Sequence, residues 1–219
     1  MTIKWIAHAC FYITLESGKT LLFDPFSGIG YEMPELTADM VFVSHSHYDH
    51  SAVDKVKGDF TVYDKPGVYE QDDVKIEGFL TYHDDVMGEA RGENIIFKIK
   101  TEGVTLAHFG DLGHIPNEEI IAQLQDVDVI FVPVGGNYTI DAKQAFALCK
   151  MLNPNMIIPM HYKTPGLTVD VATIHPFIEA ISGYYDRSMQ GKSEITFNKD
   201  DRKKRTRVMI LENSMNIIE

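Results

Sequence analysis

Hydrophobic and polar positions alternate in short runs along the first half of the chain, which is typical of half-buried β-strands. Turn-forming residues separate these runs, as in the hairpin turn expected at 16–19. Strands are predicted at residues 3–6, 10–15, 20–23, 40–44, 61–63, 74–79, 94–100 and 104–107. The first half of the chain is therefore expected to consist mainly of strands.

The second half mixes strands and helices. Two nearly all-apolar runs, 128–132 and 156–160, predict strands that are covered on both faces. Helices are predicted at 51–56, 117–125, 141–152 and 171–185, and closing strands at 195–197 and 207–211. No linker or internal repeat interrupts this order, so residues 1–219 are expected to form one domain of two packed sheets, each covered by helices.

Composition narrows the class of protein. The chain has 219 residues, is 44% hydrophobic and carries a net charge of −12, which disfavours nucleic acid as a partner. Its one basic run, 202–207, reads as a solvated turn. No transmembrane segment or secretion signal is expected, and Cys10 and Cys149 lie in apolar surroundings that suit reduced thiols. These features predict a cytoplasmic protein, and a homo-oligomer stays open.

A dense cluster of metal-ligating side chains follows the predicted strand at 40–44. His45, His47, Asp49 and His50 lie within six residues. Residues two apart in extended backbone point the same way, so His45 and His47 can bind one ion. Asp49 and His50 lie at the turn before the short helix predicted at 51–56, where adjacent residues diverge and can reach a second ion. The H-x-H-x-D-H spacing indicates a metal site rather than a polar loop.

Further candidate ligands follow other predicted strands, and strand ends that meet at one edge of a sheet form a cleft. Two ions with open positions for solvent and substrate need about six or seven protein ligands. We assign His45, His47 and His83 to the first ion, Asp49, His50 and His161 to the second, and Asp111 as the bridge. A carboxylate suits the bridge because its two oxygens can serve two cations.

These residues also carry a family resemblance. HSHYDH at 45–50, the isolated His83, FGD at 109–111 and MH at 160–161 resemble, in order, the motifs of the metallo-β-lactamase superfamily. WIAHACFYI, PVGGNYTID and IIPMHYKT are similar to its compact metal-dependent hydrolases, the branch that resembles ascorbate phosphate lactonase. The resemblance implies an α/β (α+β) fold, a four-layer αββα sandwich of two mixed sheets flanked by helices. It also implies a dinuclear site at one edge, with the ligands assigned above.

Several residues near the motifs keep more than one interpretation. His108 competes with His83 as the third ligand of the first ion; we favour His83, because the family places this histidine before a strand pair and the aspartate after it. His114 is expected either to face substrate or to cap the following helix. His8 either contacts substrate or a metal ligand, or is a satisfied buried histidine. Further candidates for contacting substrate are His108, Tyr138, Thr139 and Tyr162.

The chemistry expected from this site is hydrolysis. Two cations lower the pKa of a bridging water, so that a metal-bound hydroxide attacks a small ester, lactone or phosphodiester. Asp49, which can also orient the nucleophile, and Asp111 are the candidate catalytic residues. The histidine-rich ligands suit two divalent ions, foremost zinc, with manganese, iron or nickel as alternatives. Two other functions stay open: a nuclease or phosphodiesterase acting on nucleic acid, and a non-catalytic metal-binding module.

Overall fold

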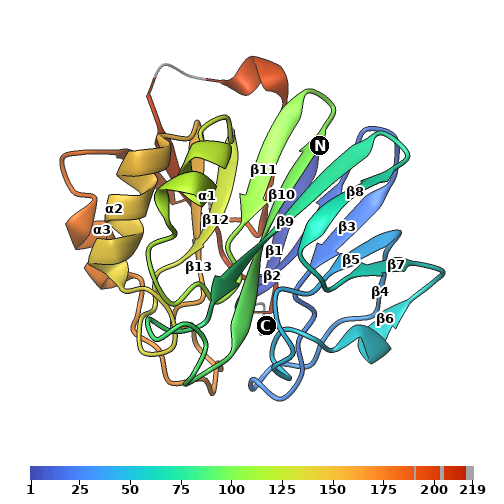
Figure 1. Cartoon of the computed structure of the whole chain (residues 1–219), viewed down its shortest axis with the longest axis horizontal. Coiled ribbons are helices and arrows are strands. Elements are labelled where there is room, and N and C mark those ends of the chain that lie inside the picture. Colours follow the sequence, from blue (N-terminus) through green and yellow to red (C-terminus); the bar gives the residue numbers. More distant parts are fainter. Residues whose placement is uncertain (190, 203–204, 216–219) are drawn as a thin grey trace.

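Two β-sheets pack face to face in the computed structural model, which describes residues 1–189, 191–202 and 205–215 (Figure 1). The first sheet has six strands in the order β15-β1-β2-β3-β5-β7. Its strands are β1 (Thr2–Ala7), β2 (Cys10–Thr14), β3 (Thr20–Phe23), β5 (Met40–Phe42), β7 (Thr61–Tyr63) and β15 (Glu194–Thr196). β15, β1, β2 and β3 pair antiparallel, and β3, β5 and β7 pair in parallel, so the sheet is mixed.

The second sheet has eight strands in the order β14-β16-β13-β12-β11-β10-β9-β8. Its strands are β8 (Gly67–Gln71), β9 (Val74–Tyr82), β10 (Glu93–Thr101), β11 (Val104–His108), β12 (Val129–Pro133), β13 (Met156–Met160), β14 (Asp186–Met189) and β16 (Arg207–Ile210). β8 to β11 are antiparallel, and the rest pair in parallel. Glu102 and Gly103 turn the β10–β11 hairpin, both with positive φ (53° and 72°), as a two-residue hairpin turn requires.

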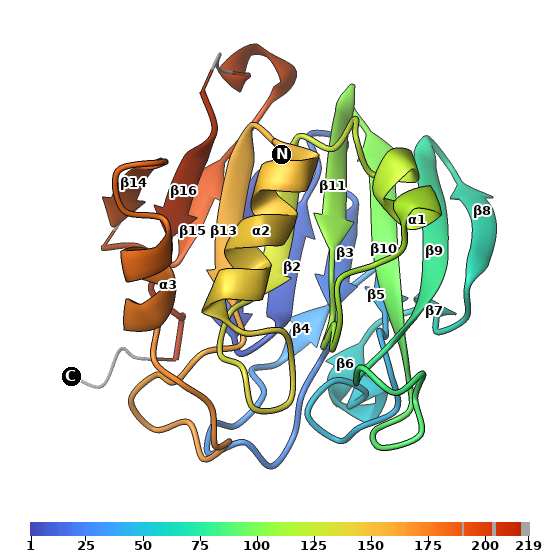
Figure 2. The ribbon, with the colours of Figure 1, turned by 60° about the vertical axis from the view of Figure 1, so that its left-hand side comes forward.

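Helices cover the outer face of the eight-stranded sheet (Figure 2). α1 (Glu118–Gln123) lies in the crossover from β11 to β12, and α2 (Ala142–Leu152) in the crossover from β12 to β13. α3 (His175–Ala180) packs beside α2. The start of α2 is fixed by a reciprocal cap: Asp141 accepts hydrogen bonds from the Lys143 and Gln144 amides, and the Gln144 side chain accepts one from the Asp141 amide.

Aromatic side chains fill the space between the sheets. Phe11 of the first sheet lies 4.4 Å from Phe131 of the second, measured between ring centroids, and Phe42 lies 5.3 Å from Phe97. A second apolar cluster lies on the other face of the six-stranded sheet. There the covering layer consists of loops, the short β4–β6 pair (Leu36–Thr37 and Val56–Lys57) and the 3₁₀ helix η1 (Val53–Lys55). The predicted mixed α/β sandwich is confirmed. Helices were expected over both sheets, but among the described residues the α-helices cover the eight-stranded sheet and only η1 lies over the other one.

Several elements of the structure differ from the prediction. In the helix predicted at 51–56 only Val53–Lys55 is helical, as the 3₁₀ helix η1, and Val56 begins β6. The helix predicted at 171–185 is wrong: only His175–Ala180 is α-helical, because Pro176 fits the first turn of a helix but not its interior. The edge strands β8 and β14 were not predicted. In β14 all four residues are exposed, so the strand lacks the alternation that marks a half-buried strand.

One residue of the basic run at 202–207, Arg202, binds a buried acidic side chain. The Arg202 guanidinium makes two hydrogen bonds to the buried Asp128 carboxylate, at 2.6 and 2.7 Å. Lys203 and Lys204 lie outside the described residues. Cys10 and Cys149 are buried free thiols, as expected. Among the described residues, no helix has the length and apolar character needed to cross a bilayer.

Candidate metal centre

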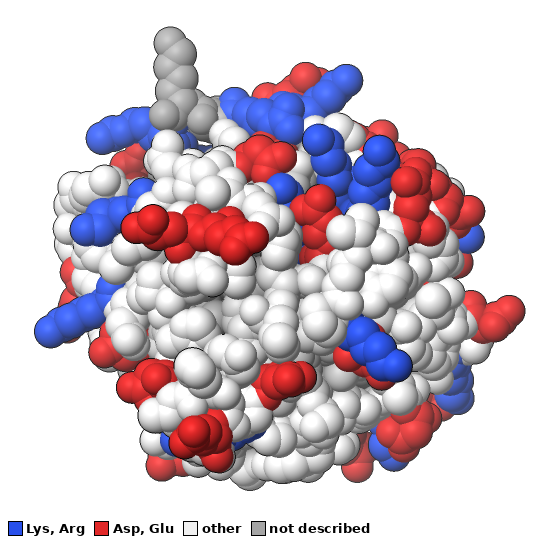
Figure 3. Space-filling view, in the orientation of Figure 1, with Lys and Arg blue, Asp and Glu red and all other residues white. Residues whose placement is uncertain are grey.

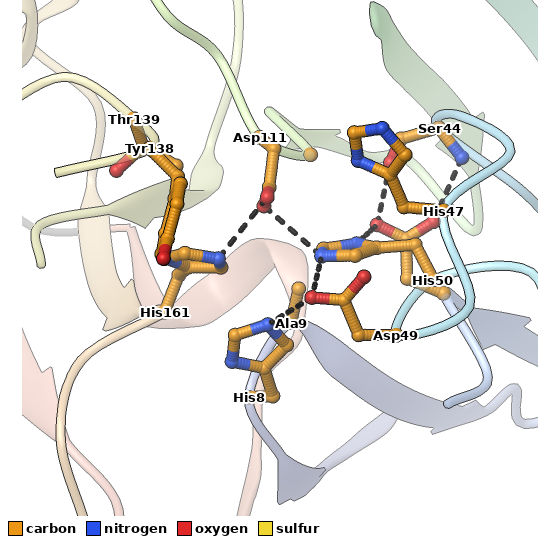
Figure 4. Close-up of polar contacts among 12 residues, drawn as sticks. His8, Ala9, Ser44, His47, Asp49, His50, Asp111, Tyr138, Thr139 and His161 are labelled. Atoms are coloured by element: carbon orange, nitrogen blue, oxygen red, sulfur yellow. Dashed lines mark hydrogen bonds and ion pairs between the residues drawn. The ribbon is translucent and has the colours of Figure 1, made fainter. Parts of the chain in front are cut away.

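Five strand ends deliver the candidate ligands to one edge of the sandwich. The hexapeptide 45–50 follows β5, and His83 directly follows β9. Asp111 lies three residues after the end of β11, and His161 directly follows β13. His8 occupies the turn between β1 and β2. Figure 4 shows the side chains of His8, Asp49, His50, Asp111 and His161 pointing toward one another although they come from distant parts of the sequence.

The candidate ligands form three overlapping groups in which the ligand atoms lie within 4.8 Å of one another. One group contains His45, His47 and His83, the residues that sequence reasoning assigned to the first ion. The other groups are His8, Asp49, His50 and His161, and His45, His50 and Asp111. The structure thus brings together all seven candidate ligands and adds His8 to them.

The Asp111 carboxylate lies at the centre of these groups. Its Oδ2 atom is 3.2 Å from His83 Nε2 and 3.1 Å from His161 Nε2. Its Oδ1 atom is 3.1 Å from His50 Nε2. One carboxylate therefore faces imidazoles of both predicted ligand sets, which is the placement that a bridging group needs.

Several polar atoms in the cluster are buried without a hydrogen-bond partner among the described residues. They include Nε2 of His45, His50 and His161 and Oδ1 of Asp111. A buried polar atom that lacks a partner costs roughly 1–3 kcal/mol, so several at one point need an explanation. Imidazole nitrogens and carboxylate oxygens are metal ligands, and bound cations would satisfy these atoms. The residues present therefore fit a metal centre.

Charge is distributed unevenly over the cluster. Burial and the neighbouring His50 lower the pKa of His45 to about 3, so its imidazole is neutral and has a free lone pair at neutral pH. Burial lowers the pKa of His50 as well, but the Asp111 and Asp24 carboxylates outweigh it and raise that pKa well above its usual value. Burial opposes ionisation of Asp111, yet His161 and His50 hold its pKa well below the usual range. A proton on His50 thus balances the carboxylate charge that a cation would otherwise balance.

Asp24 contacts the candidate ligand His50, and the sequence reasoning missed this residue. Its carboxylate is buried and accepts a hydrogen bond from His50 Nδ1 at 2.8 Å. It also accepts hydrogen bonds from the Ser44 amide at 2.8 Å and from the Ser44 hydroxyl at 2.7 Å. These contacts fix the ring of His50 with its Nε2 atom toward Asp111. The signal in the sequence is an acidic residue directly after a buried strand, the same position that His83 and His161 occupy after theirs.

The sequence reasoning also missed Asn94, which lies within β10. Its side-chain oxygen accepts a hydrogen bond from the Asp111 amide at 2.9 Å, and its amide nitrogen donates to the Phe109 carbonyl at 3.0 Å. The turn between them needs a glycine, because Gly110 has φ of 53° and a Cβ there would collide with the Asn94 and Ser44 side chains. Asn94 and Gly110 together set the position of the Asp111 carboxylate.

The structure also places the residues whose roles stayed open. His108 lies outside the cluster: its Nε2 atom donates to the Ala9 carbonyl at 2.8 Å, and its Nδ1 atom accepts from the Gly110 amide at 3.2 Å. His83 instead lies in the cluster, with Nδ1 donating to the Tyr138 carbonyl at 3.0 Å. His8 is buried, with Nε2 3.3 Å from Asp49 Oδ2.

His114 and two other candidates for substrate contact point elsewhere. His114 accepts a hydrogen bond from the Tyr82 amide at 3.3 Å, and Asn117, not His114, caps α1. The Thr139 hydroxyl donates to the Ile140 carbonyl. Tyr162 is buried beside Trp5, at 5.1 Å between ring centroids. None of these three candidates lines the cavity over the cluster.

A cavity of about 470 Å³ opens over the cluster. Its wall includes the candidate ligands His47, His83, Asp111 and His161. Among the remaining lining residues are Tyr48, Arg91, Tyr138 and Asp170. This volume suits a small organic molecule, and the position of the cavity gives such a molecule direct access to the cluster.

Two facing mixed sheets with a histidine and aspartate cluster at one edge define a metal-dependent hydrolase of the metallo-β-lactamase kind. Residues 2–161 match the family model described as the β-lactamase superfamily domain, and the chain belongs to this family. A metal-dependent hydrolase of Carboxydothermus hydrogenoformans is 32% identical, with 78% of this chain and 89% of that protein covered. One of Pyrococcus furiosus is 29% identical, with 77% and 88% covered.

A solved structure supports the same assignment. The crystal structure of a Thermotoga maritima protein, assigned there as a zinc-dependent hydrolase of the metallo-β-lactamase superfamily, superposes with a TM-score of 0.77. Its sequence is 36% identical, and the match covers 96% of this chain and 99% of that one. The resemblance that the motifs indicated is therefore confirmed over nearly the whole chain, and with it the class of metal-dependent hydrolases.

Proposed function

We propose that the chain binds two divalent ions and hydrolyses a small ester, lactone or phosphodiester. The ligand sets are His45, His47 and His83 for the first ion and Asp49, His50 and His161 for the second, with Asp111 between them. One observation carries the proposal: buried Nε2 atoms of His50 and His161, which come from two separate segments, lie 3.1 Å from the oxygens of the Asp111 carboxylate beside a cavity. Zinc suits these nitrogen and oxygen ligands, and manganese, iron and nickel are the alternatives.

The chain's own residues prepare the site for hydrolysis. When bound, ions of this kind lower the pKa of water and polarise the oxygen of an electrophile. Asp24 keeps the proton of His50 on Nδ1, away from the cavity, and Asn94 holds the Asp111 backbone. Burial of the cluster excludes bulk water and so strengthens each of these electrostatic contacts. His8 holds one oxygen of Asp49 and leaves the other free to orient a nucleophile.

The distribution of charge favours a small substrate over nucleic acid. Lys and Arg side chains gather along the upper edge of the molecule in Figure 3. Arg202 donates to the carbonyl of Gly103, in the turn between β10 and β11. β11 runs from this turn toward the cluster, so Arg202 and the cluster lie at opposite ends of the strand. A nucleic acid bound with its phosphate backbone next to the cluster would need basic residues in the wall of the cavity itself. Arg91 is the one Lys or Arg in the wall of that cavity among the described residues.

Replacing Asp111 by Ala tests the proposal. Bound metal is measured by elemental analysis, and turnover on a panel of phosphodiesters, lactones and thioesters. We expect the variant to lose metal and to lose at least the roughly 10–100-fold in activity that even outer contacts of a metal site contribute. Asp73→Ala is the matched control, because Asp73 is an exposed carboxylate in the turn between β8 and β9.

Two outcomes would contradict the proposal. Unchanged turnover in Asp111→Ala would show that hydrolysis does not use this cluster. Tight metal binding by the wild-type protein without hydrolysis of any substrate in the panel would instead indicate a non-catalytic metal-binding module.

A further inference from the structure

The wall of the cavity contains a cation that the metal centre does not use. Arg91 lies in the loop between β9 and β10 and lines the same cavity as Asp111 and His161. The whole chain carries a net charge of −12, so a positive side chain at this position needs a reason. The inference drawn from it rests on the proposed function, because it concerns the substrate of that same site.

The loop that carries Arg91 is held by one buried carboxylate. Asp84 accepts hydrogen bonds from four backbone amides, at distances between 2.7 and 3.0 Å. Their donors are Val86, Gly88, Ala90 and Arg91 itself. A loop of polar and glycine residues would otherwise have many conformations. Asp84 therefore fixes the backbone from which the Arg91 side chain extends.

The guanidinium group of Arg91 is held close to the metal centre. It lies over the ring of Tyr138, with its carbon 5.5 Å from the ring centroid, a cation–π contact. The backbone carbonyl of Tyr138 accepts the hydrogen bond from His83 Nδ1. One residue, Tyr138, thus contacts both the guanidinium and a candidate metal ligand.

The charge of Arg91 is left available. Among the described residues, no Asp or Glu side chain forms an ion pair with it, although most other arginine side chains there do bond to acids or carbonyls. Outside the metal cluster, the one acid in the cavity wall among the described residues is Asp170, which is exposed. A guanidinium supported on an aromatic ring presents paired N–H donors that match a carboxylate or a phosphate.

We propose that Arg91 binds an anionic substituent, a carboxylate or a phosphate group, of a substrate whose scissile bond lies over the metal centre. Arg91 is then the residue that selects anionic substrates. The reaction at the metal centre is unchanged by this assignment, because the anionic group is remote from the bond that breaks.

Three methyl esters of equal chain length test the proposal on the metal-loaded protein. Dimethyl succinate is neutral, monomethyl succinate carries a carboxylate, and methyl 3-phosphonopropionate carries a phosphonate. Dissociation constants are measured by ligand-observed NMR, and kcat/KM wherever hydrolysis occurs. The variants are Arg91→Met, which keeps an unbranched apolar side chain without the charge, Arg91→Lys, and Lys75→Met. Lys75 is an exposed lysine of β9 that lies outside the cavity, so its replacement controls for net charge.

A charge-assisted contact at a solvent-exposed site predicts that Arg91→Met weakens binding of one or both anionic esters by about tenfold. Binding of the neutral ester should stay unchanged, Arg91→Lys should restore part of the loss, and Lys75→Met should resemble the wild type. The two anionic arms tell a carboxylate site from a phosphate site. Equal weakening of all three esters, or no change for either anion, would overturn the proposal.

The binding measurements keep this inference separate from the proposed function. If no ester is hydrolysed but the anionic esters still bind through Arg91, the hydrolase proposal fails and the anion site stands. If Asp111→Ala abolishes hydrolysis while Arg91→Met changes the dissociation constants of neutral and anionic esters equally, the hydrolase proposal stands and the anion site is refuted.

Discussion

Asp24→Asn separates the role of the carboxylate from the shape of the site. The amide has nearly the same volume, but its nitrogen cannot accept the hydrogen bond that His50 Nδ1 donates at 2.8 Å. Asp24 accepts at both oxygens, from the Ser44 amide at one and from His50 at the other, so Asn places its NH₂ donor against another donor in either orientation and disturbs the support of the His50 ring. Loss of an outer hydrogen bond of this kind lowers metal affinity by about 10–100-fold. Only the ion assigned to His50 should be affected.

The assay is a chelator competition that reports two binding constants for the wild type. In Asp24→Asn we expect the stoichiometry at limiting metal to fall toward one ion, with the other site retained. Asp39→Asn is a close control: Asp39 also accepts hydrogen bonds from the amide and hydroxyl of one residue, Thr20, at 2.8 and 2.9 Å, but lies away from the cluster. Equal metal affinities in Asp24→Asn and the wild type would refute the idea that Asp24 orients His50.

Three further predictions concern stability. Gly110→Ala should lower the free energy of unfolding in urea by about 2 kcal/mol or more, because it adds both backbone strain and a collision with Asn94. Gly18→Ala is the control: Gly18 has φ of 86° and nothing lies within 4 Å of an added Cβ, so this variant adds the strain alone and should be destabilised less. The pKa of His50 is raised in the folded protein, so its protonation contributes its full stabilisation of the metal-free protein below about pH 6.5, the pKa of an unfolded histidine. The free energy of unfolding should therefore fall as the pH rises through the folded-state pKa, and His50→Gln should remove this decline. Metal removal by a chelator should lower Tm, with recovery on adding zinc in excess of Kd; an identical Tm with and without metal would contradict a resident ion.

Hydrophobic patterning was enough to predict the strands that face the core. β1 to β3, β5 and β9 to β13 were expected close to their observed positions, because one or both faces of each strand are buried. The same reasoning failed at the edges of the larger sheet. β14 has no buried residue, and in β8 none is fully buried, so backbone pairing with a neighbour defines these strands rather than burial.

The candidate ligands were visible in the sequence, whereas the residues that position them were not. Metal-binding chemistry restricts ligands to a few residue types, and H-x-H-x-D-H concentrates them. Asp24 and Asn94 are 20 and 17 residues away in sequence from the groups they hold, Ser44 and Asp111. Arg91 depends in the same way on the loop that Asp84 organises. The positioning roles of these residues arise from tertiary contacts, so no local sequence pattern predicts them.

One backbone device explains how strands deliver side chains to the cluster. His8, Asp24 and His161 each directly follow the last residue of a strand, and each has a left-handed φ, of 57°, 45° and 53°. A strand that continued would alternate its side chains between the faces of the sheet. A single left-handed residue ends the strand and turns its side chain along the edge, where the other ligands lie.

That device has a cost of roughly 1–3 kcal/mol for each non-glycine residue, so it persists only where the surroundings enforce it. Here the enforcing contacts link two of the three: the His161 amide donates to the His8 carbonyl at 3.2 Å, and the Trp5 indole donates to the same carbonyl at 3.0 Å. Asp24 is held by Ser44 and His50. Strain, tertiary hydrogen bonds and buried polar atoms thus occur at the same strand ends. A stable scaffold that tolerates all three at one edge is best explained if that edge binds a cation.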